Sequence, residues 1–270
     1  MRIGLFFNSD LELSAKVASA ILSADYGKRA VEFVYAGGET FRGELDIAIS
    51  IGGDGTFLMT SKTIMGLNVP LYGINTGRLG FLACGEASSA VRDVEKILDG
   101  NYELLSRVPL KGEVVREGSV IRTVRAFNEI MIVKNFVSRP IALSARINGE
   151  KLYDFLSDGI IVSTSAGSTA YALSSGGPVI HPDVYCAAVI PICPHSLSPR
   201  PVIVPDSTSI KIKLEFSRYG AVLSGDGQDN AEMLSGDEVL VTCDREMKIG
   251  VIRLGGGSYF GVLRNKLNWS

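Results

Sequence analysis

Apolar residues in the first hundred positions form short runs separated by segments of helical period. The runs at 2–7, 31–35, 45–51 and 69–74 are almost continuously apolar, which predicts strands buried on both faces. Apolar residues recurring near the helical period predict helices, whose expected spans are 9–27, 56–65 and 87–98. Strands and helices that alternate in this way indicate a parallel sheet with helices on its faces.

Turn and cap residues give some of the boundaries. Ser9 and Glu12 have the spacing of a capping box, so we expect Ser9 to cap the first helix and Gly27 to end it. Asn148-Gly149 is typical of a two-residue hairpin turn.

From about residue 102 the pattern changes to short β-rich runs with little helical period. The clearest runs are at 110–116, 120–125, 141–147, 160–164, 209–216, 239–243 and 248–254. Such runs favour an antiparallel sandwich. We therefore predict an α/β N-terminal domain over 1–101, completed by the tail 255–270, and an all-β sandwich domain over 102–254.

Composition narrows the class of protein. The 29 acidic and 27 basic residues nearly cancel, so no strongly basic face is available for a nucleic acid. The N-terminal apolar run is far below the roughly 18 to 20 residues of a membrane span, and we expect neither a membrane helix nor a signal peptide. Four cysteines without a C-x-x-C pair are typical of reduced core thiols, which favours the cytoplasm.

The strongest local motif reads Gly-Gly-Asp-Gly-Thr over 52–56, between a buried strand and a helix. Glycines at the end of a strand let the backbone approach a phosphate, and the helix N-terminus attracts an anion. A carboxylate at Asp54 would oppose a bound phosphate, so a base or a metal contact explains it better. Neither a Walker phosphate loop nor a G-x-G-x-x-G fingerprint is present.

A second motif spans 157–178, where a β-branched strand leads into small and hydroxylated residues. Ser168, Thr169 and Ser174 offer hydroxyls, Tyr171 offers a stacking face, and Asp158 accepts hydrogen bonds. The alternative, a flexible loop, is less favoured because apolar strands flank the segment.

Two further groups are polar residues within apolar surroundings. Asn128 and Glu129 interrupt the start of a strand, and a ligand is one partner that such groups can have. Asp226-Gly227, before Gln228, is a common turn dipeptide and is uninformative by itself. His181 and His195 lie beside prolines in expected turns, which favours structural roles for both.

Together these segments resemble the NAD kinase family over essentially the whole chain and in the family's order. The matching segments are 52–56, 73–81, 128–129, 158–159, 167–171, 194–197, 200–201 and 226–228. The set is specific, whereas Gly-Gly-Asp-Gly alone also occurs in lipid kinases and phosphofructokinases. The resemblance implies an interdomain site and homodimers or homotetramers.

The resemblance also implies site residues and a reaction. Asp54 would be the general base that acts on the ribose hydroxyl, and Phe81 would supply an apolar wall. The residues implied to bind the dinucleotide are Asp54, Gly55, Phe81, Asn128, Glu129, Arg139, Asp158, Thr169, Ala170, Tyr171, Ala172, Leu173, Ser174 and Gln228. The reaction would move a phosphoryl group from ATP, another triphosphate or polyphosphate to the 2′-hydroxyl of the adenosine ribose of NAD, producing NADP.

No carboxylate cluster suggests a preformed metal cage, so we expect Mg²⁺ or another divalent cation to arrive with the donor. Two alternatives stay open. One is a lipid or small-alcohol kinase with the same glycine-rich loop, and the other is a noncatalytic NAD-sensing module.

The chain departs from the family's pattern in three places. Ser165 and Ala166 stand where the family usually has Pro-Thr, and Met59 and Leu156 stand where many members carry a basic residue. Lys62, about one helical turn beyond Met59, is our candidate for contacting a donor phosphate instead.

Overall fold

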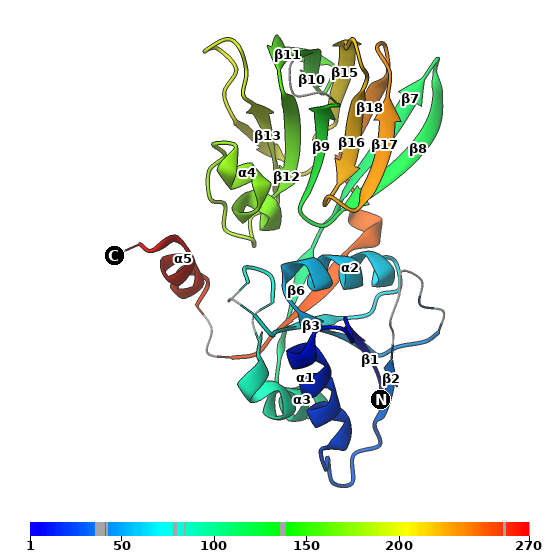
Figure 1. Cartoon of the computed structure of the whole chain (residues 1–270), viewed down its shortest axis with the longest axis vertical. Coiled ribbons are helices and arrows are strands. Elements are labelled where there is room, and N and C mark those ends of the chain that lie inside the picture. Colours follow the sequence, from blue (N-terminus) through cyan, green and yellow to red (C-terminus); the bar gives the residue numbers. More distant parts are fainter. Residues whose placement is uncertain are drawn as a thin grey trace. The chain divides into compact units, whose positions relative to one another are not determined.

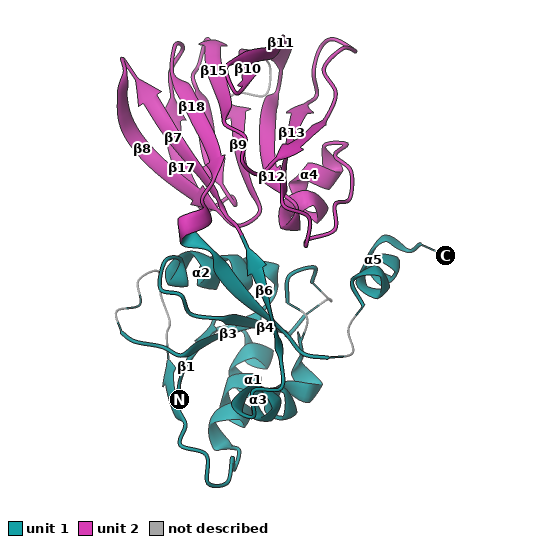
Figure 2. Ribbon diagram, turned by 180° about the vertical axis from the view of Figure 1, so that it is seen from behind, with its two compact units in different colours: residues 1–107, 247–270 teal, residues 108–246 magenta. Residues whose placement is uncertain are grey.

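The chain forms two compact units. A computed structural model describes residues 1–35, 41, 43–77, 80–83, 85–135, 139–255 and 258–269. Unit 1 consists of Met1–Arg107 and Met247–Ser270, and unit 2 consists of Val108–Glu246 (Figures 1 and 2). The predicted combination of an α/β domain and an all-β domain is confirmed.

Unit 1 is built on a mostly parallel sheet. Its strands are β1 (Arg2–Phe7), β2 (Glu32–Tyr35), β3 (Ile47–Gly52), β4 (Leu71–Asn75), β5 (Gly85–Glu86), β6 (Glu103–Arg107) and β19 (Ile249–Arg253). Their order is β2-β1-β3-β4-β19-β6, with β5 beside β4, and the pairs are parallel except β19 with β6. The central strands β3 and β4 are buried along their whole length, as their apolar runs predict.

Helices cover both faces of this sheet. They are α1 (Glu12–Ser23), α2 (Asp54–Ile64) and α3 (Ala90–Leu98, after the short η1, Ala87–Ser89), and a further helix, α5 (Tyr259–Leu267), follows β19. α1 and α3 lie together on one face, where Ile21 and Ile97 share a core with Ile49 of β3, and α2 lies on the other face (Figure 1). No helix in the described part of the chain is long and apolar enough to cross a membrane.

Several sequence predictions about unit 1 need correction. The first helix, α1, ends at Ser23 with Ala24 as its C-cap, so the expected end at Gly27 is wrong. α1 begins at Glu12 with Leu11 as its N-cap, and no side chain of a described residue caps it, so the expected capping box at Ser9 does not form. Asn8 instead accepts a hydrogen bond from the Asp10 N–H at 2.9 Å. β6 and β19, which the sequence pattern places with the sandwich, pair with each other and with β4. A short β-rich run does not reveal which sheet it joins, because that depends on long-range pairing.

Unit 2 is a sandwich of two antiparallel sheets. The first has the order β11 (Glu150–Ser157), β10 (Ile141–Ile147), β15 (Ile210–Phe216), β18 (Glu238–Cys243), β7 (Leu110–Arg116) and β8 (Ser119–Ala126). The second has the order β14 (Val202–Pro205), β13 (Cys186–Ile192), β12 (Gly159–Thr164), β9 (Glu129–Lys134), β16 (Ala221–Gly225) and β17 (Asp229–Met233). The Asn148-Gly149 hairpin is confirmed, since both residues have positive φ (51° and 87°) between β10 and β11.

The core of unit 2 lies between the inner faces of the sheets, where Ile130 and Ile160 meet Leu143 and Ile212. The outer face of the second sheet is also covered. There the short helix α4 (Tyr171–Ser174) follows η2 (Ala166–Thr169), and its Ala172 packs with Ile161 and Ile190.

The single turn η3 (Arg245–Met247) follows β18. Its first residue, Arg245, forms an ion pair with Asp206 at 2.7 Å, which links the end of β18 to the loop after β14. The thiols of Cys186, Cys193 and Cys243 are free, and Cys84 lies outside the described residues.

Candidate functional site

The predicted site residues fall into both units. Asp54, Gly55 and Phe81 belong to unit 1, and the others belong to unit 2 (Figure 2). Arg78 and Leu79, which are part of the matching segment 73–81, lie outside the described residues.

In unit 1 the glycine-rich loop joins β3 directly to α2. The sequence predicts that the helix begins near residue 56, but it begins at Asp54, with Gly53 as the N-cap. Gly52 fits closely against the helix, since a Cβ there would lie 2.3 Å from Thr56 Oγ1. The loop thus brings the first turn of α2, the positive end of the helix dipole, to the end of a buried strand.

The Asp54 carboxylate is held by a second loop of unit 1. Its Oδ2 accepts a hydrogen bond from the Phe81 N–H at 3.0 Å, and its Oδ1 accepts one from the Leu82 N–H at 3.2 Å. A carboxylate in the first turn of a helix is also favoured by the helix dipole. Each oxygen of an ionised carboxylate has further acceptor capacity, so both can still accept a hydroxyl proton or a cation.

The side chains around Asp54 differ in their exposure. Gly55 is exposed, and the centroid of the half-buried Phe81 ring lies 5.3 Å from Lys266 Nζ of α5. Lys62 is exposed in the last turn of α2, about 12 Å along the helix axis from Asp54.

In unit 2 a polar cluster lies where β9 begins and where β12 and β16 end. Asn128 is 5% exposed and immediately precedes β9. Its carbonyl accepts a hydrogen bond from the Thr164 N–H at 2.8 Å. Gly167 lies against the same carbonyl, because a Cβ on Gly167 would come within 2.2 Å of Asn128 O. The small-residue segment therefore packs directly on Asn128. A side chain at position 167 would prevent this contact.

Two oxygens in this cluster lack partners. Asn128 Oδ1 and Glu129 Oε2 are buried and make no hydrogen bond with any residue that the structure describes. A buried polar atom left in this state costs free energy, and a ligand with hydroxyl or amino donors would satisfy both atoms.

Glu129 also has a perturbed proton affinity. Burial, and then the nearby Asp226 charge, raise its pKa from 4.5 to about 7, although a hydrogen bond from the Tyr171 N–H opposes this shift. Glu129 thus changes charge near neutral pH, which is common among groups that bind or transform a ligand.

The segment after β12 is ordered by its own hydroxyls. Thr164 Oγ1 donates to Phe127 O at 2.9 Å and accepts from the Gly167 N–H at 3.0 Å. Ser168 Oγ accepts from the Ile180 N–H at 3.0 Å and lies 3.2 Å from Ile180 O. These hydrogen bonds favour a defined conformation of the segment over the flexible-loop alternative.

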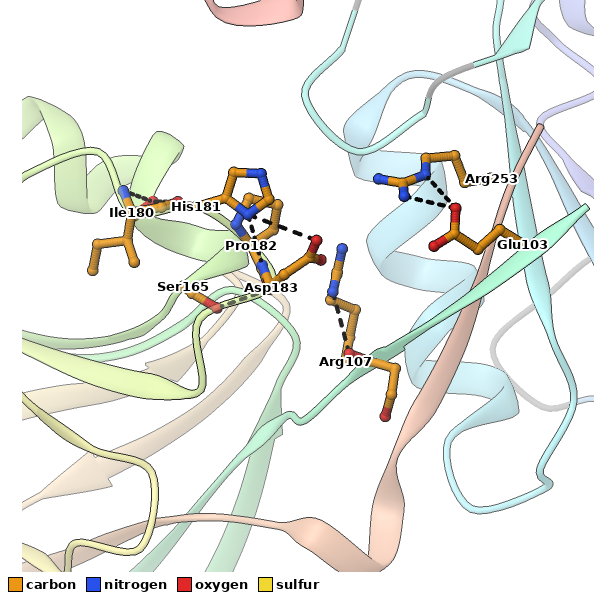
Figure 3. Close-up of polar contacts among 10 residues, drawn as sticks. Glu103, Arg107, Ser165, Ile180, His181, Pro182, Asp183 and Arg253 are labelled. Atoms are coloured by element: carbon orange, nitrogen blue, oxygen red, sulfur yellow. Dashed lines mark hydrogen bonds and ion pairs between the residues drawn. The ribbon is translucent and has the colours of Figure 1, made fainter. Parts of the chain in front are cut away.

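Ser165, which stands where the family usually has proline, has a partner of its own. Its Oγ donates to Pro182 O at 3.2 Å (Figure 3). Next to Pro182, the His181 ring accepts from the Asp183 N–H at 3.3 Å, which agrees with the structural role expected for His181 (Figure 3). The loop after β12 is therefore attached to the 180–183 segment.

The predicted site residues in α4 and just before it differ in how exposed their side chains are. Thr169, Ala170 and Leu173 are half-buried, whereas Tyr171 and Ser174 are exposed. Ala172 is 0% exposed, and its carbonyl accepts from the Gly177 N–H at 2.9 Å. Its methyl group anchors α4 in the core and does not line an open pocket.

Asp158 lies away from this cluster. β9 and β12 are antiparallel, with Ser163 opposite Glu129 and Gly159 opposite Val133. Asp158 is therefore about 17 Å from the Glu129 end of the sheet. It lies at the opposite end, and there it forms an ion pair with Lys134. Within unit 2, Asp158 and Glu129 do not converge on one point.

Arg139 and Gln228 lie in connections. Arg139 is exposed in the segment between β9 and β10, beyond the Lys134 end of the strand. Gln228 is exposed in the turn between β16 and β17, two residues after Asp226. Gln228 thus lies at the Glu129 end of the sheet, and Arg139 follows the opposite end.

Asp226 and Thr164 are the residues that sequence reasoning missed. Asp226 accepts hydrogen bonds from the backbone N–H groups of Phe127, Asn128 and Glu129 at 2.6 to 3.0 Å. An Asp-Gly pair is so common in turns that nothing local distinguishes this one. The only signal was that 226–228 is one of the segments that match the family.

Family models match both units. The model of the ATP-NAD kinase N-terminal domain matches residues 8–102, and that of the ATP-NAD kinase C-terminal domain matches residues 127–252. Among similar proteins, the NAD kinase of Aromatoleum aromaticum is 40% identical over 241 residues, which cover 89% of this chain and 80% of that protein. The NAD kinase of Heliobacterium modesticaldum is 32% identical over 98% of both chains.

Solved structures share the fold. A yeast NADH kinase complexed with NADH superposes with a TM-score of 0.88 at 21% identity, over 100% of this chain and 88% of that one. An NAD kinase from Archaeoglobus fulgidus in complex with ATP gives a TM-score of 0.74 at 24% identity, over 99% of both chains. The matches over both units and the identity to bacterial relatives lead to one conclusion: this chain belongs to the NAD kinase family.

Proposed function

We propose that this protein phosphorylates NAD on the 2′-hydroxyl of its adenosine ribose and releases NADP. Family membership supports the reaction. The observation that carries the proposal is the pair of buried oxygens without partners, Asn128 Oδ1 and Glu129 Oε2, beside a segment of small and hydroxylated residues. Ribose hydroxyls and the adenine amino group are donors of the kind that these acceptors need.

In this proposal the dinucleotide is bound mainly by unit 2. Asn128 and Glu129 accept its hydrogen bonds, while Thr169, Ala170, Tyr171, Leu173 and Ser174 border it, with Gln228 nearby. Asp158 and Arg139 contact a different part of the ligand from Glu129, because the strand register separates the two ends of the sheet. The 44% exposed Tyr171 ring is available for stacking on a base.

Asp54 acts in the proposal as the general base. A secondary hydroxyl is a weak nucleophile at neutral pH, so phosphoryl transfer depends on positioning, charge stabilisation and removal of the proton. The Phe81 and Leu82 N–H groups fix the Asp54 carboxylate, and its remaining acceptor capacity suits it to receive that proton.

We propose ATP as the phosphoryl donor, with another triphosphate or polyphosphate as the alternative. The positive end of the α2 dipole, at the glycine-rich loop, supports a phosphate contact next to Asp54. Mg²⁺ or another divalent cation enters with the donor and offsets the phosphate charge. We also propose that the enzyme works in the cytoplasm. We propose that it forms a homodimer or homotetramer, and light scattering after gel filtration would measure this oligomeric state.

The test is an assay of purified protein with NAD, ATP and Mg²⁺, with product detected by mass. A mass increase of one phosphoryl group, and reactivity of the product with an NADP-specific dehydrogenase, are expected. NAD binding without any product would favour the noncatalytic NAD-sensing module. Phosphorylation of a lipid or small alcohol, with NAD left unchanged, would favour the other alternative.

A further inference from the structure

The Asp226 side chain has an unusual set of partners for a turn residue. Asp226 and Gly227 connect β16 to β17, and both have positive φ (50° and 71°), as a type I′ hairpin turn requires. Asparagine and aspartate tolerate this conformation, so the backbone explains the residue type in part.

Three consecutive backbone N–H groups, at the start of β9 and just before it, donate hydrogen bonds to the Asp226 carboxylate. Oδ2 accepts from Phe127 at 2.6 Å, and Oδ1 accepts from Asn128 at 2.8 Å and from Glu129 at 3.0 Å. In return, the Asp226 N–H donates to the Glu129 carbonyl at 3.0 Å. Hydrogen bonds to an ionised acceptor are about twice as strong as neutral ones, so this contact holds the 127–129 backbone firmly.

The same stretch of backbone is held from its other side. Thr164 donates its N–H to the Asn128 carbonyl and its hydroxyl to the Phe127 carbonyl. Asn128 and Glu129 therefore lie between the β16–β17 turn and the end of β12. Their Cα positions, and with them the directions of their side chains, depend on both contacts.

We infer that Asp226 is a positioning residue for the dinucleotide, which it serves by fixing Asn128 and Glu129 and without touching the ligand. The inference rests on the proposed function, in which those two side chains bind NAD. It assigns one of the two contacts that hold the 127–129 backbone to a residue that a turn motif alone would leave without a role.

Electrostatics around Glu129 support this role. The Asp226 charge adds to burial in raising the pKa of Glu129, and the Tyr171 N–H opposes it. Asp226 thus influences both where the Glu129 carboxyl lies and whether it carries a proton when a ligand arrives.

The sharpest variant is Asp226→Asn, because asparagine has the same size and suits the same turn. Its Nδ2 would face the Phe127 N–H, so two donors would meet where one hydrogen bond is now made. We expect KM for NAD to rise about 10-fold or more, while KM for ATP changes less than about 2-fold. In a Glu129→Gln background, Asp226→Asn should raise KM for NAD by a smaller factor, because the two residues act together.

Asp237→Asn is the matched control. Asp237 is a buried carboxylate of the same unit that accepts from the Leu234 N–H and pairs with Arg116 at 2.7 Å. It follows the far end of β17 from Asp226. We expect it to lower the melting temperature without changing the ratio of the two KM values.

Hydrogen–deuterium exchange separates this inference from the proposed function. In Asp226→Asn the amides of 127–129 should exchange about 10-fold faster or more, whether or not the protein phosphorylates NAD. Unchanged exchange there, or equal rises in KM for NAD and ATP, would overturn the positioning role. An inactive wild-type protein whose variant still shows faster exchange would overturn only the proposed reaction. If Asp226→Asn does not fold, Asp226→Ser is measured in the same way.

Discussion

Gly80 lies directly against the Asp54 carboxylate: a Cβ on Gly80 would be 2.0 Å from Asp54 Oδ1. The N–H groups that bind this carboxylate come from the next two residues, Phe81 and Leu82. The loop therefore reaches Asp54 closely enough for these hydrogen bonds because residue 80 has no side chain.

Gly80→Ala should displace the Asp54 carboxylate and weaken both hydrogen bonds. Misplacing a catalytic group by about 1 Å can cost on the order of 100-fold in rate, so we expect kcat to fall by about 10- to 100-fold. Gly77→Ala is the control, since a Cβ there would have only an ordinary contact, 3.8 Å from Asn75 Oδ1. Steady-state kinetics of both variants check this, and equal kcat values would contradict it.

Asp54→Asn should lower kcat by roughly 10²- to 10⁴-fold, the usual contribution of a general base. The affinity for NAD should change less, because the proposal assigns most dinucleotide contacts to unit 2. Turnover measured at saturating substrates, together with NAD binding by calorimetry, tests both parts. Near-normal turnover would remove Asp54 from the catalytic role.

Glu129 should make stability depend on pH. Its pKa is raised from 4.5 to about 7 in the folded protein, so the folded state binds the proton more tightly than the unfolded state does. The contribution of Glu129 to folding stability is therefore greatest below pH 4.5, and this contribution is lost as the pH rises through 7. Between pH 5 and pH 8 the loss should be roughly 2 to 3 kcal/mol.

Glu129→Gln supplies the comparison, because glutamine does not titrate. The difference in unfolding free energy between the wild type and this variant should change by that amount between the two pH values. Urea unfolding at pH 5 and pH 8 measures it. A difference that stays constant with pH would show that Glu129 has an ordinary pKa.

Ser165→Ala should cost about 1 kcal/mol of stability, because the Pro182 carbonyl loses its hydrogen-bond donor. Ser165→Pro should be less harmful. Ser165 has φ of −59°, which proline adopts, and a proline reduces the entropy of the unfolded chain by about 0.4 to 1 kcal/mol. Thermal unfolding of the two variants decides this, and a proline variant less stable than the alanine variant would contradict it.

Lys62→Ala should raise KM for ATP several-fold while KM for NAD stays nearly constant. Our hypothesis is that Lys62, in the last turn of α2, contacts a donor phosphate as a point charge. Lys16→Ala, on the exposed side of α1, serves as the control for loss of one positive charge. Unchanged apparent affinity for ATP would refute the contact.

Much of the fold followed from local pattern. Apolar runs predicted β1 and the central strands of unit 1, and the Asn148-Gly149 dipeptide predicted the hairpin between β10 and β11. Such predictions succeed because burial on both faces, or a turn with positive φ, restricts which residues a few consecutive positions can hold. The order of motifs also indicated the family, which the comparisons confirm.

Long-range pairing decided the rest. Whether β19 joined the sandwich or the sheet of unit 1 depended on β4 and β6, which are far from it in the sequence. The register of β9 with β12 placed Asp158 at the opposite end of the sheet from Glu129. The chain by itself determined which residues form strands, helices and turns, because those choices depend on neighbours. Tertiary structure alone brought Asp226 to the N–H groups of 127–129, because partners nearly a hundred positions apart meet only when strands pair.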